Sequence, residues 1–381
     1  MEAFMKETYK CEKCGGILEY DVASQSLKCA NCDTEVQITA ENKRIKEHNL
    51  TRQAKREKKA ESHEKVIMRC EGCGAMVEFD ETCTANECPY CGSNYVLADK
   101  QVKSLVPDGV LPFQIDKNKV GEIFAKWIKS RWLAPGELKT LYQKDKLHGI
   151  YMPYWTFDAK ADCDYTAMGG KDRKVTRKNS KGEEETVTET DWYFTKGHIK
   201  KTFDDVLEPA SDKLKLSLLE GVEPYNTKEV KPYSPDYMAG YLSEVYTIDL
   251  ESAHHQAKRE MQSELHRMAE HDVKRKYDRV KDMQLDVEYR DETYKHILIP
   301  VYSTAYYYKG KQYTVLINGQ TGKMKGDYPK SPFKIGILIV IAAVILGIFF
   351  FAMTSESKGI EETAIQTEVT AEYDVTAYDL T

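Results

Sequence analysis

Eight of the ten cysteines fall into two sets of four with one common spacing. Both sets read C-x2-C-x14-C-x2-C, and the second set repeats the first with a shift of 59 residues. Four thiolates from two short knuckles form a closed tetrahedral site, which is typical of a structural zinc ion with no open position for a substrate. The sequence therefore predicts two structural Zn²⁺ ions per chain. The ligands would be Cys11, Cys14, Cys29 and Cys32 in one site, and Cys70, Cys73, Cys88 and Cys91 in the other.

The residues around the two sets repeat as well. Gly15-Gly-Ile-Leu-Glu-Tyr-Asp21 matches Gly74-Ala-Met-Val-Glu-Phe-Asp80 in the placement of apolar and acidic residues. We therefore expect two zinc ribbons, over 1–40 and 66–100. Iron in a rubredoxin-like site is the alternative, because sulfur-only tetrahedral sites also suit iron. A metal analysis separates the two.

The remaining cysteines, Cys83 and Cys163, have no partner at ligand spacing and are expected to be free thiols. No H-E-x-x-H motif occurs among the nine histidines, so zincin chemistry has no support. Reduced thiolates agree with a cytoplasmic location. We expect a protein that is not an enzyme.

The charge of the ribbons argues against nucleic-acid binding by their surfaces. Residues 1–100 hold 15 Lys and Arg against 18 Asp and Glu, a net charge of -3. Residues 43–59 hold eight of those bases and only two acids, which leaves -9 for the ribbons and their borders. Phosphate backbones are bound by surplus cations. Only residues 43–59, between the two ribbons, have a surplus of positive charge.

This linker, 41–65, is expected to be a basic, partly helical spacer. Its bases would contact anionic lipid headgroups or nucleic acid if it does more than separate the ribbons. They are Lys43, Arg44, Lys46, Arg52, Lys55, Arg56, Lys58 and Lys59.

A membrane segment is predicted over 335–353, which contains 19 consecutive uncharged and mostly apolar residues. At about 1.5 Å per residue such a helix spans roughly 28 Å, close to the thickness of a bilayer's hydrocarbon core. Four lysines precede it and one follows closely, which places the N-terminal body in the cytoplasm. The first ten residues contain no apolar run, so no signal peptide is expected. The tail 354–381, with seven acids and one base, is expected to be disordered outside the cell.

The region 101–330 is predicted to be an α+β body of strands and helices. Apolar residues recur with helical spacing behind Asp116 up to Ala134, and again over 250–276. Strands are predicted at 151–161, 191–198, 283–289, 297–308 and 312–317. Residues 169–189 are expected to form a mobile loop with a basic and an acidic half. Prolines within apolar runs, such as Pro153 and Pro300, indicate edge strands or strand entrances.

Two body motifs carry a resemblance to a known family. Together with the paired ribbons and the closing apolar segment, Gly149-Ile-Tyr-Met-Pro-Tyr-Trp-Thr-Phe-Asp158 and Val315-Leu-Ile-Asn-Gly-Gln-Thr-Gly322 resemble bacterial TFIIB-type zinc-ribbon membrane proteins. Such proteins are often labelled primosomal helicase-like, but the chain contains no P-loop motif. Some relatives are encoded beside a phage-shock protein A homologue and a flotillin-like (SPFH) protein, which implies a membrane-stress or membrane-organising complex.

These observations favour a membrane-anchored zinc-ribbon adaptor that recruits proteins at the cytoplasmic face of the membrane. The alternative is a membrane-tethered protein that binds nucleic acid or the transcription machinery through residues 43–59 and the ribbons. An enzyme or small-ligand sensor in the body is a third possibility. Asp158, Asp162 and Asp164 lie close together in sequence, but a solvated strand end explains them equally well.

Overall fold

The computed structural model describes residues 9–38, 45–51, 62–65, 67–78, 88–93, 95–97, 102–139, 147–178, 180 and 182–349. The fold mixes α-helices and β-strands, as predicted. The chain divides into two compact units. One comprises Met1–Ala125 with Gln143–Asp327, and the other Lys126–Tyr142 with Tyr328–Thr381.

The first unit is built on a mixed sheet of twelve strands. Its central path runs β13-β10-β15-β11-β14-β7-β6-β8, and β4, β12, β16 and β17 pair beside this path. The shorter strands of this sheet are β4 (His48–Asn49), β6 (Ile67–Cys70), β7 (Met76–Glu78), β8 (Tyr95–Leu97), β10 (Gly109–Val110), β13 (Lys231–Pro232), β14 (Leu242–Glu244), β16 (Lys311–Asn318) and β17 (Met324–Gly326).

Two smaller sheets and several short helices complete this unit. One sheet has the order β1-β2-β3, and the other pairs β5 with β9. Their strands are β1 (Leu18–Asp21), β2 (Ser26–Cys29), β3 (Glu35–Val36), β5 (Ser62–Lys65) and β9 (Val102–Leu105). The short helices are α3 (Leu216–Val222), η3 (Thr227–Glu229) and η4 (Pro235–Met238).

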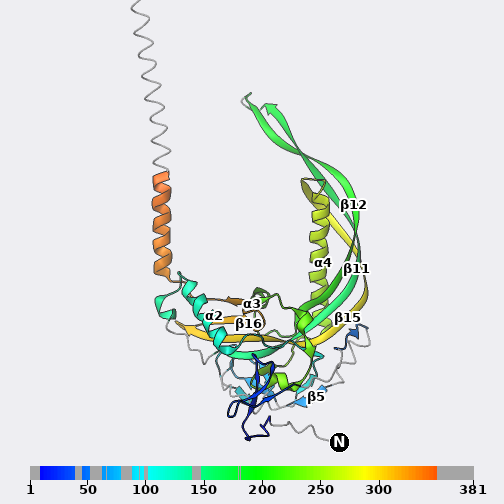
Figure 1. Cartoon of the computed structure of the whole chain (residues 1–381). Coiled ribbons are helices and arrows are strands. Elements are labelled where there is room, and N and C mark those ends of the chain that lie inside the picture. Colours follow the sequence, from blue (N-terminus) through cyan, green and yellow to red (C-terminus); the bar gives the residue numbers. More distant parts are fainter. Residues whose placement is uncertain are drawn as a thin grey trace, which may run out of the picture. The chain divides into compact units, whose positions relative to one another are not determined.

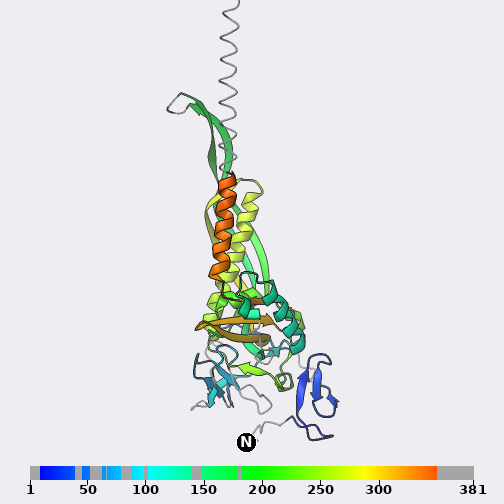
Figure 2. The same ribbon diagram turned by 90° about the vertical axis from the view of Figure 1, so that its left-hand side faces the viewer.

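Three very long strands leave the sheet together and form an arm (Figure 1). They are β11 (His148–Lys178), β12 (Glu184–Pro209) and β15 (Arg279–Tyr308), and β11 pairs antiparallel with both others. Helix α4 (Leu250–Lys274) runs along the inner face of the curved strands, and the β11–β12 hairpin extends beyond its last turn (Figures 1 and 2).

Local bulges bend these strands. Asp205, Asp282 and Asp291 have φ of 52°, 54° and 52°, and each lies where the register of β11 with a neighbouring strand shifts. Aspartate tolerates this left-handed conformation better than most residues, and a bulge bends a strand and increases its twist. The aspartates therefore give the arm its curvature, which allows it to wrap around one side of α4.

Helix α4 begins at an aspartate cap and packs through one face. The Asp249 side chain accepts a hydrogen bond from the Ser252 N–H at 2.8 Å. Apolar residues at helical spacing, among them Ala257, Met261 and Leu265, are at most 2% exposed. They pack against Phe157, Cys163 and other residues of the arm strands in one of two hydrophobic clusters. The predicted helix 250–276 is thus confirmed apart from its last residues.

The strands predicted at 283–289 and 297–308 are confirmed as strand segments, but the prediction that they are separate is wrong. Both lie in one uninterrupted strand, β15, of 30 residues. The polar run between them, from Arg290 to Lys295, stays in the sheet because the Asp291 bulge accommodates the extra residue and Lys160 pairs with Asp291 at 2.8 Å.

The expected mobile loop over 169–189 is wrong for most of its length. Strand β11 continues to Lys178 and β12 begins at Glu184, so only a short turn joins them. The basic half lies opposite the acidic half across the hairpin. Arg173 pairs with Glu189 at 2.8 Å and with Asp191 at 3.0 Å, and Arg177 also pairs with Glu189. Opposite charges facing each other across a ladder favour strand pairing.

The two prolines inside long strands lie where a neighbouring strand is exchanged for another. Beside Pro153, β11 changes its partner from β14 to β12, and the Pro153 carbonyl accepts from the Ala210 N–H at 2.9 Å. Beside Pro300, β15 changes its partner from β10 to β16, and the carbonyl accepts from the Gly319 N–H at 2.9 Å. Proline has no backbone N–H, and at these two positions the strand exchanges one neighbour for another, so no hydrogen bond to that neighbour is lost.

The second unit contains the end of helix α2 (Lys117–Ser130), the 3-10 helix η1 (Gly136–Lys139) and an apolar helix, Pro332–Phe349. The start of α2 belongs to the first unit, where the Asp116 carboxylate caps it by accepting from the N–H groups of Asn118 and Lys119 at 2.7 and 3.0 Å. The predicted helix behind Asp116 is confirmed, although it ends at Ser130 rather than near Ala134.

Candidate metal centres

All four cysteine knuckles share one backbone pattern. The N–H of the residue after each second cysteine donates to the carbonyl of the first cysteine, at 2.7–3.0 Å. The N–H of the first cysteine donates to the carbonyl of the second residue after the second cysteine, at 2.7–2.9 Å. The residue after the second cysteine has positive φ in every knuckle, between 56° and 73°. It is Gly15, Gly74, Gly92 and, as the one exception, Asp33.

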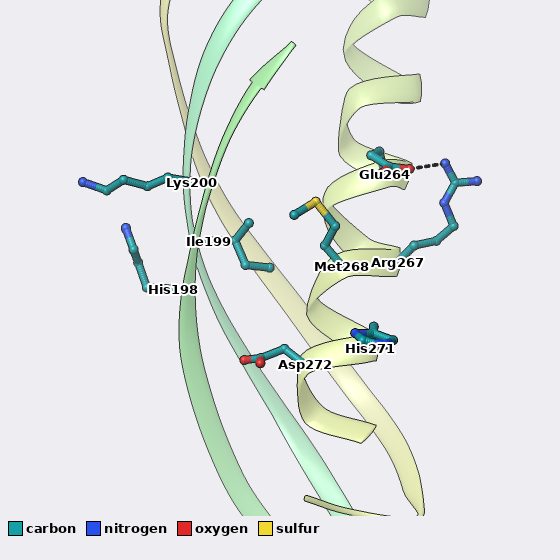
Figure 3. A pocket seen from close by; sticks show the side chains of 8 residues that line it. All are labelled: His198, Ile199, Lys200, Glu264, Arg267, Met268, His271 and Asp272. Carbon is teal, nitrogen blue, oxygen red and sulfur yellow. Dashed lines mark hydrogen bonds and ion pairs between the residues drawn. The ribbon is translucent and has the colours of Figure 1, made fainter. Parts of the chain in front are cut away.

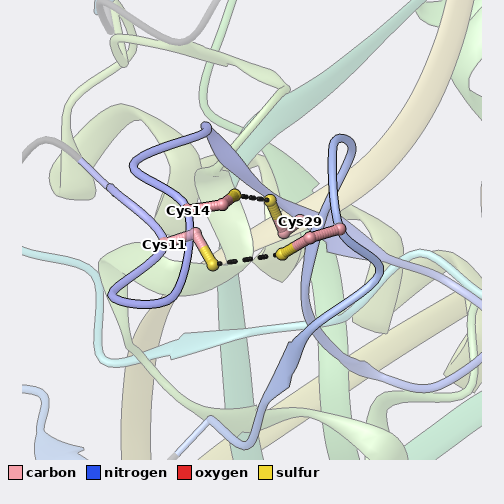
Figure 4. A group of neighbouring side chains, drawn as sticks. Cys11, Cys14 and Cys29 are labelled. Carbon is pink, nitrogen blue, oxygen red and sulfur yellow. Dashed lines mark hydrogen bonds between the residues drawn. The ribbon is translucent and has the colours of Figure 1, made fainter.

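This geometry turns the sulfur atoms of each knuckle toward one point. Within each set of four, the Sγ atoms all lie within 4.8 Å of one another. Two of the separations are 3.6 Å (Cys11–Cys32) and 3.5 Å (Cys14–Cys29) in the first set, drawn in Figure 4. In the second set they are 3.3 Å (Cys70–Cys91) and 3.7 Å (Cys73–Cys88).

These distances match a shared metal and exclude disulfides. A disulfide requires about 2.05 Å between the sulfurs, whereas a tetrahedral ion with Zn–S bonds of about 2.3 Å holds its sulfurs roughly 3.8 Å apart. The predicted ligand sets thus come together as two four-cysteine clusters, each compatible with one metal ion.

Neighbouring groups stabilise a thiolate in the first cluster. The Thr34 hydroxyl lies 3.1 Å from Cys32 Sγ, and hydrogen bonds from Thr34 lower the pKa of Cys32 to about 6. A backbone N–H, that of Gly16, donates to Cys14 Sγ at 3.4 Å. The Gly16 bond lowers the pKa of Cys14, but the neighbouring sulfurs of Cys32 and Cys29 outweigh it and raise that pKa to about 12, so Cys32 is the thiolate that these contacts favour.

The first cluster sits in its own three-stranded sheet, β1-β2-β3. Among the described residues, hydrogen bonds and ring contacts join this sheet to the rest of the first unit. The Tyr20 N–H donates to the Ala239 carbonyl at 3.0 Å, and the Gln25 side chain donates to the Phe113 carbonyl at 2.9 Å. The Tyr20 ring packs edge-on against Tyr237 at 5.5 Å between centroids.

The second cluster is part of the central sheet. Strand β7 pairs with β14, so the ribbon extends the twelve-stranded sheet. Cys70, Cys88 and Cys91 belong to the same hydrophobic cluster as Ile150, Met152 and other central residues. The repeat in sequence therefore produces one ribbon with its own sheet and one ribbon built into the body.

Residues between and around Cys88 and Cys91 carry this attachment. Ser303 donates to the Pro89 carbonyl at 2.7 Å, Gln312 to the Tyr90 carbonyl at 2.6 Å, and Tyr307 to the Cys91 carbonyl at 3.0 Å. The Tyr90 hydroxyl donates to Glu244 at 2.5 Å. Glu244 also accepts from Ser211 at 2.6 Å, and burial raises its pKa to about 7.

Sequence reasoning missed these attachment residues. The one available signal was Tyr90, which stands between the cysteines of the second ribbon where the first ribbon has Asn31. Its buried partner, Glu244, lies 154 residues away in sequence, so no local pattern connects the two.

Most of the predicted basic contact residues fall outside the described part of the chain. Lys46 is described and exposed, whereas Lys43, Arg44, Arg52, Lys55, Arg56, Lys58 and Lys59 lie outside it. Within the predicted helical linker, the described residues 45–51 and 62–65 contain the strands β4 and β5 and no helix, and the rest of the linker lies outside the described residues. Cys83 also lies outside the described residues. Cys163 is a fully buried thiol in the arm core.

A polar groove of about 520 Å³ lies between β12 and α4 (Figure 3). Ile199 and Met268 point into the space between strand and helix, whereas His198 and Lys200 lie on the opposite side of the strand from α4. His198 pairs there with Asp162 at 3.2 Å and Asp164 at 2.8 Å. His198 and Lys200 thus face away from the side chains that α4 contributes to the groove.

The apolar helix Pro332–Phe349 is long and apolar enough to cross a membrane, with a mean hydropathy of 2.5. None of its 18 residues is buried within the structure. It overlaps the first part of the predicted segment 335–353, and the residues after Phe349 lie outside the described part.

The chain is 27% identical over 329 residues to the uncharacterized protein YdjG of Bacillus subtilis strain 168, a match that covers 86% of this chain and 92% of YdjG. No protein family profile matches the chain. No solved structure matches it either.

Proposed function

We propose that this chain is a membrane-anchored, non-enzymatic adaptor with two structural zinc ions, which recruits proteins at the cytoplasmic face of the membrane. The observation that carries the proposal is the combination, in one chain, of two closed four-cysteine clusters and an exposed apolar helix.

The metal clusters support a structural role for the ions. Four thiolates around each ion leave no open position, so the ion cannot bind and polarise a substrate. The knuckle backbone bonds and the buried Cys29, Cys70 and Cys88 favour rigid, permanently occupied sites. Zinc is proposed over iron because closed sites of four cysteines on paired knuckles are typical of structural zinc.

The exposure of the apolar helix supports the anchor. Ile339, Leu346 and Phe349 are 64%, 67% and 63% exposed, and their neighbours along the helix are similar. Contiguous apolar surface of this extent marks an interaction site on a protein in water. A bilayer covers all faces of such a helix at once, whereas a protein groove covers only one.

A surface suited to protein recruitment lies on the arm. On the β11–β12 hairpin, Phe194 is 68% exposed, whereas Tyr193 points to the opposite face of the strand, where its ring stacks on Tyr277 at 6.2 Å between centroids. Aromatic side chains are enriched at protein interfaces. The resemblance to TFIIB-type zinc-ribbon membrane proteins suggests phage-shock protein A-like or flotillin-like proteins as partners, and a membrane-stress complex as the setting.

The test is a tagged full-length chain compared with a chain that lacks residues 332–353. Both are purified with detergent and co-purifying proteins are identified by mass spectrometry. A third chain, with these residues replaced by an unrelated membrane-spanning helix, is the control. We expect the full-length and control chains to co-purify with the same partner proteins, and these partners to leave the membrane fraction when only the truncated chain is present.

Two results would contradict the adaptor. One is that the partners stay at the membrane without the anchored chain. The other is nuclease-sensitive nucleic acid that co-purifies in a steeply salt-dependent manner, which would favour the nucleic-acid alternative instead.

A further inference from the structure

We propose that the turn 131–134, which follows α2, lies in the headgroup region of the bilayer beside the start of the apolar helix, with Trp132 and Phe333 inserted at the membrane surface. This inference rests on the proposed membrane anchor. It adds a second contact with the bilayer, which we call the interfacial collar and define as residues 126–134 with 328–334.

Hydrogen bonds hold the turn against the first turn of the apolar helix. The Ser331 N–H donates to the Leu133 carbonyl at 2.8 Å. The Lys334 ammonium donates to the carbonyls of Trp132 and Ala134, at 2.8 and 2.7 Å. Lys334 thus joins the start of the apolar helix to two carbonyls of the turn that follows α2. These bonds join segments about 200 residues apart in sequence.

Because of these bonds, the depth of the turn follows the depth of the helix. The intrahelical bond from the Ile335 N–H to the Ser331 carbonyl, at 3.1 Å, places the helix start at the same residues that hold the turn. The uncharged stretch begins at Ile335. If that stretch enters the hydrocarbon core, the turn stands at the boundary between hydrocarbon and water.

Two large aromatic side chains are exposed at this boundary. Trp132 is 59% exposed and Phe333 is 76% exposed. By contrast, nearby Trp127 is held within the unit, with its ring 5.9 Å from Tyr328 and the Arg131 guanidinium 4.8 Å from its centroid. Trp is enriched at membrane interfaces because its ring is apolar and its N–H is polar.

The charge of the collar complements an anionic membrane surface. The collar, residues 126–134 with 328–334, contains five lysines and arginines and no acid. The exposed bases include Lys126, Lys129 and Lys330. Each base near an anionic leaflet contributes about 1 kcal/mol. Aromatic residues and bases together favour a lipid surface over a hydrophobic protein partner.

The experiment measures quenching of tryptophan emission by brominated lipids. The full-length chain is reconstituted into anionic vesicles with bromine placed near the headgroup or deep in the acyl chains. The variants are Trp132→Phe and, as matched control, Trp192→Phe in the arm. We expect shallow bromine to quench more strongly than deep bromine, Trp132→Phe to lose most of that quenching, and Trp192→Phe to keep it.

Unchanged quenching in Trp132→Phe would overturn the collar. Carbonate extraction of the same vesicles separates this failure from failure of the anchor. A chain that resists extraction but shows no Trp132 quenching is anchored without a collar. A chain that is extracted contradicts the anchor itself and the collar with it.

Discussion

The residue after the second cysteine decides how well each knuckle closes. Three of these residues are glycines, and Asp33 alone carries a side chain in the left-handed conformation. The glycines and ligands could be predicted from the repeat, since their spacing is visible in the sequence. That Asp33 can replace a glycine at this position could not be predicted from the repeat, because it depends on the tolerance of aspartate for positive φ.

We expect Asp33→Gly to leave metal retention unchanged and Gly74→Val to weaken it. A β-branched side chain at a φ of 72° costs on the order of 1–2 kcal/mol or more. Asp33 pairs with Lys28 at 3.3 Å, and this ion pair is exposed and contributes little. The measurement is the rate of metal loss to a chelator. Equal rates for Gly74→Val and the parent chain would contradict the knuckle argument.

Equivalent cysteines in the two ribbons should differ in their effect on stability. Cys88→Ser and Cys29→Ser should each remove one of two metal ions. Cys88→Ser should also destabilise the body, because its knuckle is bonded to β15, β16 and β14, whereas Cys29→Ser should leave body unfolding nearly unchanged. Elemental analysis and thermal unfolding measure the two effects. Similar losses of body stability would show that the first ribbon is equally integrated.

Glu208 makes stability depend on pH. Its side chain is 4% exposed, its Oε1 has no hydrogen-bond partner among the described residues, and burial, reinforced by nearby Glu260 and Glu223, raises its pKa to about 8. Between the ordinary value near 4.5 and about 8, the folded chain keeps a proton that the unfolded chain releases. Stability therefore falls as pH rises through this window and then levels off.

Glu208→Gln should remove this loss. At roughly 1.4 kcal/mol per pKa unit, a pKa raised from 4.5 to about 8 corresponds to about 5 kcal/mol, so we expect the variant to be more stable by up to about 5 kcal/mol above pH 8 and equal to the parent below about pH 4.5. Urea unfolding at several pH values measures the difference. A gain that is the same at all pH values would argue for a packing effect instead of titration.

At the scale of elements, α4 and the arm stabilise each other. Leu265→Ala, at a fully buried position, should cost about 2–5 kcal/mol because it leaves a cavity in the arm core. The matched control is Gln262→Ala on the exposed face of the same helix, which should change stability by less than about 0.5 kcal/mol. The measurement is the free energy of unfolding in urea of the two variants and the parent chain. A small effect of Leu265→Ala would mean that the arm does not need α4.

Sequence periodicity located most of these elements but not their lengths. The helical spacing of Leu250, Ala257 and Leu265 predicted α4 nearly completely. The predicted strands are shorter than the observed ones because polar runs such as 290–295 are typical of loops. In the structure, a bulge at Asp291 and a cross-strand pair with Lys160 keep that run in the sheet. Such pairings are non-local, so one segment alone cannot reveal them.

At the scale of the whole molecule, the repeat predicted two alike ribbons, whereas the structure gives them different surroundings. Integration of the second ribbon depends on Tyr90 meeting Glu244, and the collar depends on Lys334 meeting the Trp132 carbonyl. These pairs are separated by 154 and 202 residues. Only the fold brings them together, which is why metal ligands could be predicted and their supports could not.

The central claim is that one chain is both anchored in the membrane and loaded with two structural zinc ions. The most direct measurement is elemental analysis of the full-length chain, purified in detergent from carbonate-washed membranes without added metal. We predict that the chain stays in the washed membranes and carries two zinc ions per chain with no iron. Recovery of the chain in the soluble wash, or of a membrane chain with iron or without metal, would contradict the account.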